Sequence, residues 1–263
     1  MSTDPTAAAQ LLHGKRILVV GVANDHSLAW GIAQALHAAG AELAFSYGAP
    51  NLERRVKPLA ESVGAAWVEP CDVSLDADIA ALFACVTSRW GRLDGLIHAV
   101  AFAERDDLKN RFTDTSRAGF QLALDVSAYS LVALARGAEP LMGAGGAITT
   151  LSYYGAEKVL PGYNVMGVAK AALEASVRYL ASELGPHRIR VNAISAGPVR
   201  TLSSAAVPGF KDMLRLHAER APLRRNVGFA DVGGAAVFLT SDHGAGVTGE
   251  VLHVDAGYNI VGH

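Results

Sequence analysis

Two tyrosine–lysine pairs between Ser152 and Lys170 have residue types and spacings that could do chemistry. Tyr154 and Lys158 stand four positions apart, and Tyr163 and Lys170 stand seven apart. A phenol can donate a hydrogen bond to an oxygen that gains negative charge, and a nearby ammonium group stabilises the same charge. The useful pair is the one that a rigid helix holds in place.

The chain around the two pairs differs in helix-forming power. Pro161 interrupts any helix that passes through Tyr154, so that pair would occupy little more than one turn. Residues 164–184 contain no proline and are rich in alanine, leucine and glutamate, which predicts a long helix. Seven residues make nearly two turns, so Tyr163 and Lys170 would lie on about the same face. The sequence favours this second pair.

Lys170 lies in the otherwise apolar stripe "MGVAKAALEA". An ammonium group there is costly unless it reaches a partner. It either extends to water or binds ribose hydroxyls and stabilises a charge on the tyrosine. Gly162 and Gly167 would allow a flat ring to approach closely. Ser152 is better explained by packing or a local hydrogen bond than by catalysis.

The elements that would position these residues alternate regularly. Short β-branched runs, mostly apolar on both faces, are separated by segments of helical period such as 28–40 and 77–91. This alternation predicts an α/β protein with a doubly wound parallel sheet, a Rossmann fold of about seven strands with helices on both faces. The predicted strands are 16–21, 42–47, 65–70, 94–100, 147–152, 188–194 and 250–255.

Composition limits the class of protein. The 263 residues are 51% hydrophobic with a net charge of −2, which excludes an ordinary nucleic-acid binder. We expect no membrane span and no secretory signal, because no apolar run is long enough. We expect a loose tail over residues 1–13 and one domain over residues 14–263. Cys71 and Cys85 have no metal-ligand spacing and are expected to be buried reduced thiols, as in a cytoplasmic protein without a metal site.

The turn after the first strand reads "GVANDHSLAWGIAQAL" and lacks the G-x-G-x-x-G fingerprint. Gly21 and Gly31 bracket small residues, and Ser27 can cap the helix and donate its hydroxyl to a phosphate. From spacing alone, a dinucleotide site and a plain capped loop are equally good interpretations.

The end of the second strand carries no acid for a ribose hydroxyl and no arginine for a 2′-phosphate. Arg54 and Arg55 follow on the next helix, where a solvated face is the simpler explanation. Asp72, after the third strand, could accept a hydrogen bond from an adenine amino group or cap the following turn.

Four stretches together resemble the enoyl-acyl carrier protein reductases of bacterial fatty-acid synthesis, a divergent branch of the short-chain dehydrogenase/reductase superfamily. They are "GVANDHSLAWGIAQALHAAGAELAFSY", "YYGAEKVLPGYNVMGVAKAALEASVRYLA", "RVNAISAGPVRTL" and "GEVLHVDAGY". The seven-residue tyrosine–lysine spacing and the G-V-A-x4-S turn are specific to that branch. The similarity runs from about Gly14 to the C-terminus.

The resemblance implies an NADH-dependent reduction of a trans-2-enoyl thioester on acyl carrier protein by a cytoplasmic homotetramer. It implies catalytic roles for Tyr163, Lys170 and Tyr153, with Lys170 also on the nicotinamide ribose, and a substrate contact at Ala103. It implies NADH contacts at Gly21, Ser27, Leu28, Gly48, Asp72, Val73, Val100, Val199, Arg200, Thr201, Leu202 and Ser203.

Three positions depart from that family's pattern. Gly48 replaces a frequent glutamine near the adenine, and Ala101 replaces a glycine on the floor of the pocket. The basic residues thought to face the carrier protein are reduced to Lys211, with Asp212 beside it. We expect the extra methyl group of Ala101 to narrow the space for a rigid inhibitor more than for a flexible enoyl chain.

Two other functions remain to be weighed. A short-chain reductase acting on a carbonyl, or on coenzyme A-type enoyl thioesters, would share the fold and the cofactor. A non-catalytic dinucleotide sensor would not need the tyrosine–lysine pair, which is present at the expected spacing. Reduction of a 2-enoyl or of a 3-oxo thioester would separate the enoyl reductase from the carbonyl reductase.

Overall fold

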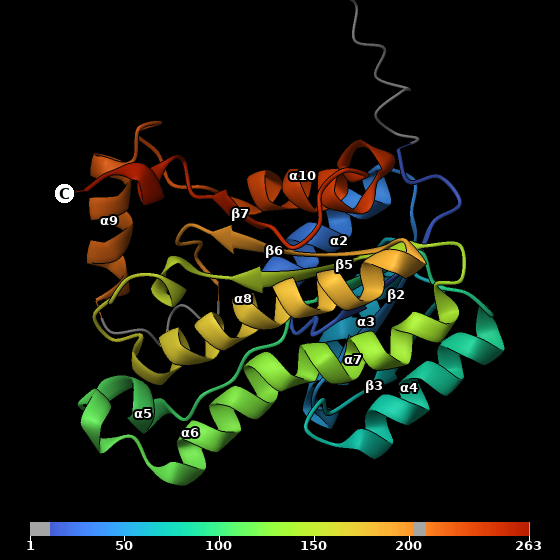
Figure 1. The fold of residues 1–263 in the computed structure, drawn as a ribbon, viewed down its shortest axis with the longest axis horizontal. Helices are drawn as coiled ribbons and strands as arrows, with labels where there is room; N and C mark the ends of the chain where they lie inside the picture. The colour runs from blue at the N-terminus through green and yellow to red at the C-terminus, as the bar shows by residue number, and fades with distance from the viewer. Residues whose placement is uncertain (1–10, 202–208, 263) are drawn as a thin grey trace, which may run out of the picture.

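The computed structural model describes residues 11–201 and 209–262, and their strands form one parallel sheet of seven strands. The strand order is β3-β2-β1-β4-β5-β6-β7, and every pairing is parallel. All seven predicted strands are present, so the predicted doubly wound sheet is confirmed (Figure 1). The strands are β1 Arg16–Val20, β2 Glu42–Tyr47, β3 Trp67–Pro70, β4 Gly95–His98, β5 Gly146–Ser152, β6 Ile189–Ala196 and β7 Val251–Val254.

The strand order reverses between β1 and β4, and a doubly wound sheet binds its ligand at this reversal, beyond the carboxyl ends of the strands. Gly21 follows β1 with φ +100° and lies against Ala99, which follows β4. A Cβ at Gly21 would be 2.5 Å from the carbonyl oxygen of Ala99. Glycine is therefore required where the two chain segments approach at the base of the crevice.

Two helical layers bury both faces of the sheet, which is why the strands are apolar on both sides. One layer contains α2 (Leu28–Ala38), α3 (Glu53–Ser62) and α10 (Phe229–Thr240). The other contains α4 (Asp76–Arg89), α7 (Ser130–Ala138) and α8 (Asn164–Leu184). Figure 1 shows α4, α7 and α8 on one side of the sheet and α2 and α10 on the other.

Shorter helices complete the structure. α5 (Arg105–Lys109) and α6 (Arg117–Leu124) follow β4, and a π-helical turn, Asp125–Tyr129, joins α6 to α7. α9 (Phe210–Arg220) precedes α10. Single 3-10 turns cover Pro50–Leu52, Phe112–Asp114, Glu139–Leu141, Tyr154–Ala156, Gly185–His187, Asp242–Gly244 and Tyr258–Ile260.

The packed part of the chain begins before the boundary predicted at residue 14. Leu12 is fully buried, and its N–H donates a hydrogen bond of 2.9 Å to the carbonyl oxygen of Ala39. Leu11 also packs against the layer that contains α2. The loose tail predicted over residues 1–13 is therefore too long by at least two residues.

One continuous helical stretch qualifies the expectation that no segment could span a membrane. Residues Arg117–Leu141 have a mean hydropathy of 1.4 over their most apolar window, so by length and composition alone this helix could span a membrane. The stretch packs against α4 and α8, and half of that window is buried inside this fold. Its apolar residues are therefore explained by the core that they help to build.

Candidate active site

The carboxyl end of β5 and the first turns of α8 bring Lys170 under the crevice. The predicted helix begins at Asn164 and ends at Leu184, as the sequence indicated. The Lys170 side chain is buried, and its Nζ donates a hydrogen bond of 2.7 Å to the carbonyl oxygen of Leu151. Burial lowers the pKa of Lys170 to about 8, and Glu174 partly opposes that shift. The side chain therefore does not extend to water.

Glu174 stands one helical turn beyond Lys170 and is also buried. The hydroxyl of Ser152 donates a hydrogen bond to its carboxylate, and burial raises the pKa of Glu174. Ser152 is therefore hydrogen-bonded to another element rather than locally, as the sequence had favoured. The charge of the carboxylate partly offsets the effect of burial on the pKa of Lys170.

Tyr163 precedes α8 and meets Tyr153, which follows β5. Their ring centroids are 5.0 Å apart in an edge-to-face arrangement with an interplanar angle of 70°. Burial raises the pKa of both phenols, that of Tyr163 most strongly. Both hydroxyls therefore remain protonated at neutral pH and can act as hydrogen-bond donors.

Two glycines make room for the Tyr163 ring. A Cβ at Gly155 would be 2.3 Å from Cδ1 of Tyr163. A Cβ at Gly167 would be 2.8 Å from the carbonyl oxygen of Gly155. The sequence indicated a close approach at Gly162 and Gly167 but not at Gly155. Its position between two tyrosines of the same loop was the available signal.

The four-residue pair is arranged differently. Tyr154 begins a 3-10 turn of three residues, and its hydroxyl donates a hydrogen bond of 3.3 Å to the carbonyl oxygen of Asn259. Its ring packs edge-on against His253 and Tyr258. Lys158 is exposed. The prediction that no rigid helix holds this pair is confirmed.

A cavity of about 240 Å³ lies beside Tyr153, between α9, the loop after β5 and the C-terminal segment. The Tyr153 hydroxyl lies 2.9 Å from Sδ of Met213 on α9. The cavity is lined by Tyr153, Tyr154, Leu160, Pro161, Gly197, Pro198, Gly209, Asp212, Met213, Leu216, His217, Asp255 and Tyr258.

The residues expected to contact a dinucleotide near the first turn are brought together. Ser27 caps α2, because its hydroxyl oxygen accepts a hydrogen bond of 3.2 Å from the N–H of Trp30. Leu28 packs in one apolar cluster with Val199, which follows β6. Val100 reaches Gly21, since its Cγ2 would be 2.9 Å from a Cβ there.

The other residues predicted near the cofactor lie around this crevice or beyond the described chain. Arg200 is exposed and Thr201 is half-buried. Leu202 and Ser203 lie outside the described residues. Among the residues that the structure describes, no cluster of His, Cys, Asp and Glu side chains could hold a metal ion.

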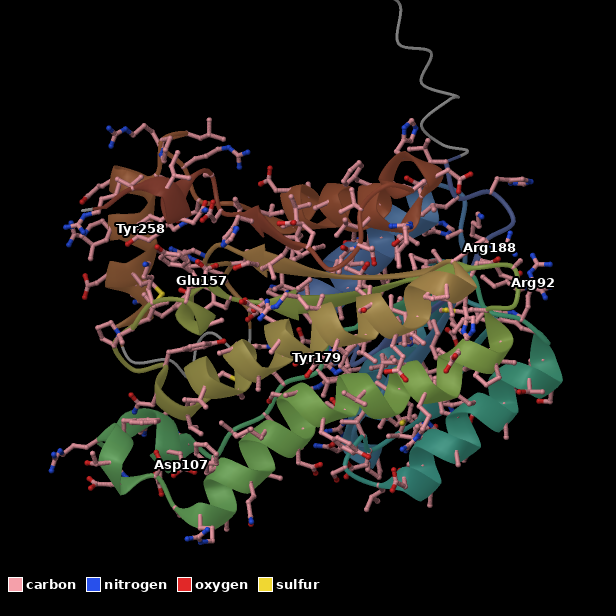
Figure 2. The ribbon with its side chains drawn as sticks, viewed as in Figure 1. Arg92, Asp107, Glu157, Tyr179, Arg188 and Tyr258 are labelled. Carbon is pink, nitrogen blue, oxygen red and sulfur yellow. The ribbon has the colours of Figure 1, made fainter. Side chains whose placement is uncertain are left out.

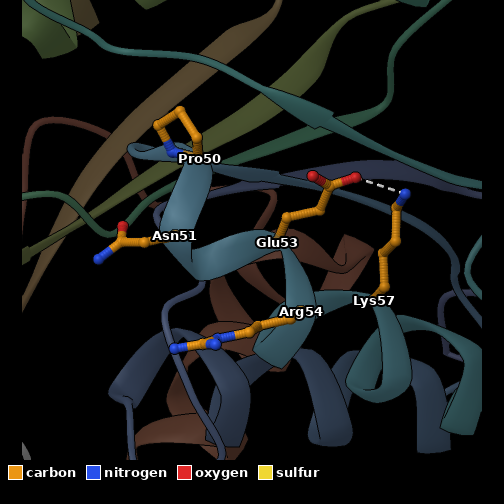
Figure 3. Close-up of a pocket in the computed structure, with 5 residues that line it drawn as sticks. All are labelled: Pro50, Asn51, Glu53, Arg54 and Lys57. Carbon is orange, nitrogen blue, oxygen red and sulfur yellow. Dashed lines mark ion pairs between the residues drawn. The ribbon is translucent and has the colours of Figure 1, made fainter.

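The end of β2 is open. A Cβ at Gly48 would meet only the carbonyl oxygen of Cys71, at 3.9 Å, so a larger side chain would fit there. A shallow pocket next to it is lined by Pro50, Asn51, Glu53, Arg54 and Lys57 (Figure 3). Figure 3 shows Lys57 paired with Glu53, while Arg54 extends away from that pair.

At the end of β3, Asp72 caps the following turn, which is one of the two roles that the sequence allowed. Its carboxylate accepts hydrogen bonds from the N–H and the hydroxyl of Ser74, so it caps the turn. Val73, its neighbour, is buried in the core. This capping leaves the role of Asp72 toward an adenine as a prediction.

The loop after β4 is held by side-chain hydrogen bonds that the sequence did not predict. Ser127, on the π-helical turn, accepts a hydrogen bond of 3.0 Å from the N–H of Phe102 and donates one of 3.1 Å to its carbonyl oxygen. These two hydrogen bonds fix the backbone at Phe102. Its neighbour Ala101 is exposed, and its other neighbour, Ala103, packs near Tyr163. The π-helical turn was not predicted, because "DVSAYS" is compatible with a regular helix.

His98, at the end of β4, is a second residue that the sequence reasoning missed. It is fully buried, with Nδ1 2.7 Å from Oγ1 of Thr150 and Nε2 2.8 Å from Oγ of Ser130. Burial, with a smaller contribution from Lys170, lowers its pKa to about 3. A neutral His98 therefore ties β4, β5 and α7 together beneath the crevice.

With this geometry in place, comparison with known proteins identifies the family. The family model described as enoyl-(acyl carrier protein) reductase matches residues 21–259. The chain belongs to this family. It is 57% identical over 252 residues to the enoyl-acyl-carrier-protein reductase (NADH) FabI of Rickettsia bellii, covering 96% of each chain. It is 55% identical over 255 residues to the enzyme of the same name from Bacillus cereus, covering 96% of this chain and 100% of that one.

Solved structures of relatives agree with the fold. The reductase of Anaplasma phagocytophilum, in complex with NAD, superposes with a TM-score of 0.94 at 54% identity, covering 97% of both chains. The Bacillus cereus enzyme, with NADP+ and indole naphthyridinone, gives a TM-score of 0.95 at 55% identity, covering 97% of this chain and 100% of that one. The resemblance read from the four sequence stretches is thus confirmed at the level of the family.

Proposed function

We propose that this protein reduces the carbon–carbon double bond of a trans-2-enoyl thioester on acyl carrier protein with NADH, in bacterial fatty-acid synthesis. The observation that carries the proposal is the half-buried, protonated Tyr163, which packs against Tyr153 and precedes the helix that holds Lys170. The names of relatives that are 57% and 55% identical support the same substrate and cofactor.

The phenol of Tyr163 is the group that stabilises the reaction. When the β-carbon of the enoyl thioester is reduced, negative charge moves to the thioester oxygen. A preorganised donor aimed at that oxygen lowers the barrier by about 3 kcal/mol, as at an oxyanion hole. The ammonium of Lys170 is held in place by its hydrogen bond to the carbonyl oxygen of Leu151, and from there it would keep the local potential positive and bind ribose hydroxyls of the cofactor. Tyr153 provides a second donor next to the substrate.

The crevice fits a nicotinamide dinucleotide. When bound, NADH supplies the hydride. The close approach of Gly21 to Ala99 removes side-chain atoms from the base of the crevice, and the amino end of α2 faces it. We propose that Gly21, Ser27 and Leu28 hold the diphosphate side. The adenosine and nicotinamide sides would be held by Gly48, Asp72, Val73, Val100, Val199, Arg200, Thr201, Leu202 and Ser203.

The carrier protein would approach across α9. Lys211 on this helix is an exposed cation that suits an acidic partner, with Asp212 beside it, whereas Arg215 is ion-paired with Glu219. Ala103 would contact the substrate, because it packs in the cluster that contains Tyr163.

The direct test uses purified protein with NADH and a matched pair of thioesters on acyl carrier protein. The proposal predicts oxidation of NADH with the 2-enoyl thioester and at least tenfold slower oxidation with the 3-oxo thioester, since the two differ in the group reduced. Faster reduction of the 3-oxo thioester would replace the proposal with a carbonyl reductase.

We also propose a cytoplasmic homotetramer in which each chain contributes one catalytic domain. Tyr179 on α8, labelled in Figure 2, is 80% exposed. Tyr129, which precedes α7, is 46% exposed, so neighbouring helices carry large uncovered aromatic rings. Burial raises the pKa of Cys71 to about 12, which suits an unreactive thiol in a reducing compartment. Light scattering of wild type and of Tyr179→Glu tests the assembly, which should dissociate in the variant.

A further inference from the structure

Asn164 follows Tyr163 in the chain and begins α8 in a backbone conformation that residues with a side chain uncommonly adopt. Its φ is +41°, in the left-handed region. Asparagine tolerates this region better than most residues, but it remains strained there. Strained residues persist only where their surroundings hold them, and they concentrate at functional sites. The contacts of the Asn164 side chain show what holds it.

The side-chain amide of Asn164 reaches the end of α5, which lies far from it in the sequence. Its Nδ2 lies 3.2 Å from the carbonyl oxygens of Asp107 and Leu108 and 2.8 Å from that of Asn110. Two N–H groups are therefore shared among three acceptors. The last carbonyl groups of a helix have no partner inside it. Asn164 supplies that partner from another element.

The other side of α5 is anchored to α6. Asp107 is buried, and its carboxylate accepts a hydrogen bond of 3.3 Å from the N–H of Ser116, which caps α6 (Asp107 is labelled in Figure 2). A Cβ at Gly119 would overlap that carboxylate, so only glycine lets α6 come so close. α5 is thus held between α6 and the first residue of α8.

The segment that Asn164 holds also carries the expected substrate contact. Ala103 leads into α5, and it packs with Leu108 and Tyr163 in one small apolar cluster against α8. Apolar packing is non-directional and does not by itself fix how two segments are aligned. The hydrogen bonds of Asn164 are directional, so they set the position of this segment relative to Tyr163.

We propose that Asn164 is a positioning residue, which holds α5 and the substrate-contacting residue Ala103 at a fixed place relative to the phenol of Tyr163. The inference rests on the proposed function and adds a residue to it. Asn164 is joined to Tyr163 through the backbone and to α5 through its side chain, so the two parts move as one unit. Without these hydrogen bonds the enoyl thioester would bind in several positions, most of them unproductive. The NADH contacts proposed after β1 would be unchanged.

The main test is Asn164→Gly, because glycine adopts a positive φ freely and the change removes the amide. The KM for a crotonyl thioester of acyl carrier protein should rise about fivefold to tenfold, the worth of one or two neutral hydrogen bonds. The KM for NADH should stay within about twofold. Asn110→Ala is the control, because it keeps the carbonyl oxygen that Asn164 contacts.

A second variant separates the hydrogen bonds from the shape of the side chain. Asn164→Asp keeps that shape and the tolerance of a positive φ. Its carboxylate cannot donate and would face three carbonyl oxygens, so the KM for the crotonyl thioester should rise more than in Asn164→Gly. A crotonyl KM in Asn164→Asp equal to that of wild type would contradict the proposal, since shape alone would then be sufficient.

Limited proteolysis measures the position of α5 without any turnover. Lys109 and Arg111 are exposed at the end of α5, so trypsin cleaves there when this segment loosens. Mass spectrometry should show this cleavage about fivefold to tenfold faster in Asn164→Gly than in wild type or Asn110→Ala. Cleavage after Arg188, which is exposed beyond the other end of α8, should not change.

An unchanged crotonyl KM in Asn164→Gly would overturn the proposal whether or not cleavage is faster, and a raised KM without faster cleavage would do the same. Equal changes in the KM for NADH and in cleavage after Arg188 would also overturn it, because Asn164 would then support the whole fold. Failure of the proposed function would look different: wild type would oxidise no NADH with the crotonyl thioester, whatever the cleavage pattern.

Discussion

The crevice is built in opposite ways at the ends of β5 and β2. At the end of β5, Lys170 is buried, Tyr163 is half-buried, and glycines shape the space around the Tyr163 ring. At the end of β2, Asn51 and Arg54 are exposed around a shallow pocket, and Gly48 leaves open space. The difference teaches that fixed geometry is concentrated where charge develops in the reaction, while an end that only recognises a ligand tolerates exposed side chains.

Removing the ammonium at the β5 end should give the largest effect. Lys170→Met should lower kcat/KM by about a hundredfold or more and raise the KM for NADH, because charge stabilisation and ribose binding are lost together. Steady-state kinetics with NADH and an enoyl thioester measure both. Lys158→Met is the matched control, since Lys158 is exposed. Equal losses of kcat/KM in Lys170→Met and Lys158→Met would contradict the assignment of the active site to Lys170.

Crowding the Tyr163 ring should give the next largest effect. Gly155→Ala would place a Cβ 2.3 Å from Cδ1 of Tyr163, so the phenol must move. We expect kcat to fall about thirtyfold and the free energy of unfolding to fall by about 1–3 kcal/mol. Gly185→Ala is the control, because nothing lies within 4 Å of a Cβ there. Unchanged turnover in Gly155→Ala would mean that the ring position is not critical.

The burial of Lys170 also predicts opposite pH dependences of activity and stability. As pH rises through its pKa of about 8, the ammonium is lost, and kcat/KM should fall by up to about tenfold per pH unit. The unfolded chain keeps that proton up to its ordinary pKa of 10.5. It therefore binds more protons than the native protein between those values, so this group's contribution to the free energy of unfolding rises with pH there.

Profiles of kcat/KM and denaturant unfolding between pH 7 and pH 10 measure the two trends, with Lys170→Met as the reference for both. If the difference in the free energy of unfolding between wild type and Lys170→Met does not change over this pH range, the pKa of Lys170 is not lowered in the native protein.

The exposed β2 end should give the smallest effect. We expect a lower KM for NADH than for NADPH, because no bidentate arginine site is built at that turn. Arg54→Ala should raise the KM for NADPH by about twofold to fivefold, the usual worth of an exposed ion pair, and leave that for NADH unchanged. A lower KM for NADPH in wild type would contradict the expected preference.

The sequence predicted features that depend on local periodicity. The strands are apolar on both faces, so their number and parallel pairing followed, and the proline-free run 164–184 fixed the main helix. Burial of Lys170 was one of two outcomes that the apolar stripe allowed. The sequence could not choose between them, because the carbonyl of Leu151 belongs to another element.

The features that were missed depend on contacts between distant segments. Gly155 matters because the "LPG" turn folds Tyr163 back over it. His98 is paired with Thr150 and Ser130, which lie 52 and 32 positions away. Ser127 reaches Phe102 only because the helix is π-helical there, and no local signal in "DVSAYS" requires that. Tertiary packing, not local propensity, decides such positions.

The choice of tyrosine is the central claim, and one comparison tests it directly. Tyr163→Phe and Tyr154→Phe each remove a single hydroxyl, one on the ring that packs against Tyr153 and one that donates to the carbonyl oxygen of Asn259. Turnover of an enoyl thioester should be measured for both, together with NADH affinity by fluorescence titration. The account predicts at least a tenfold loss of kcat in Tyr163→Phe with nearly unchanged NADH affinity, and a mild effect in Tyr154→Phe. A larger loss in Tyr154→Phe would contradict it.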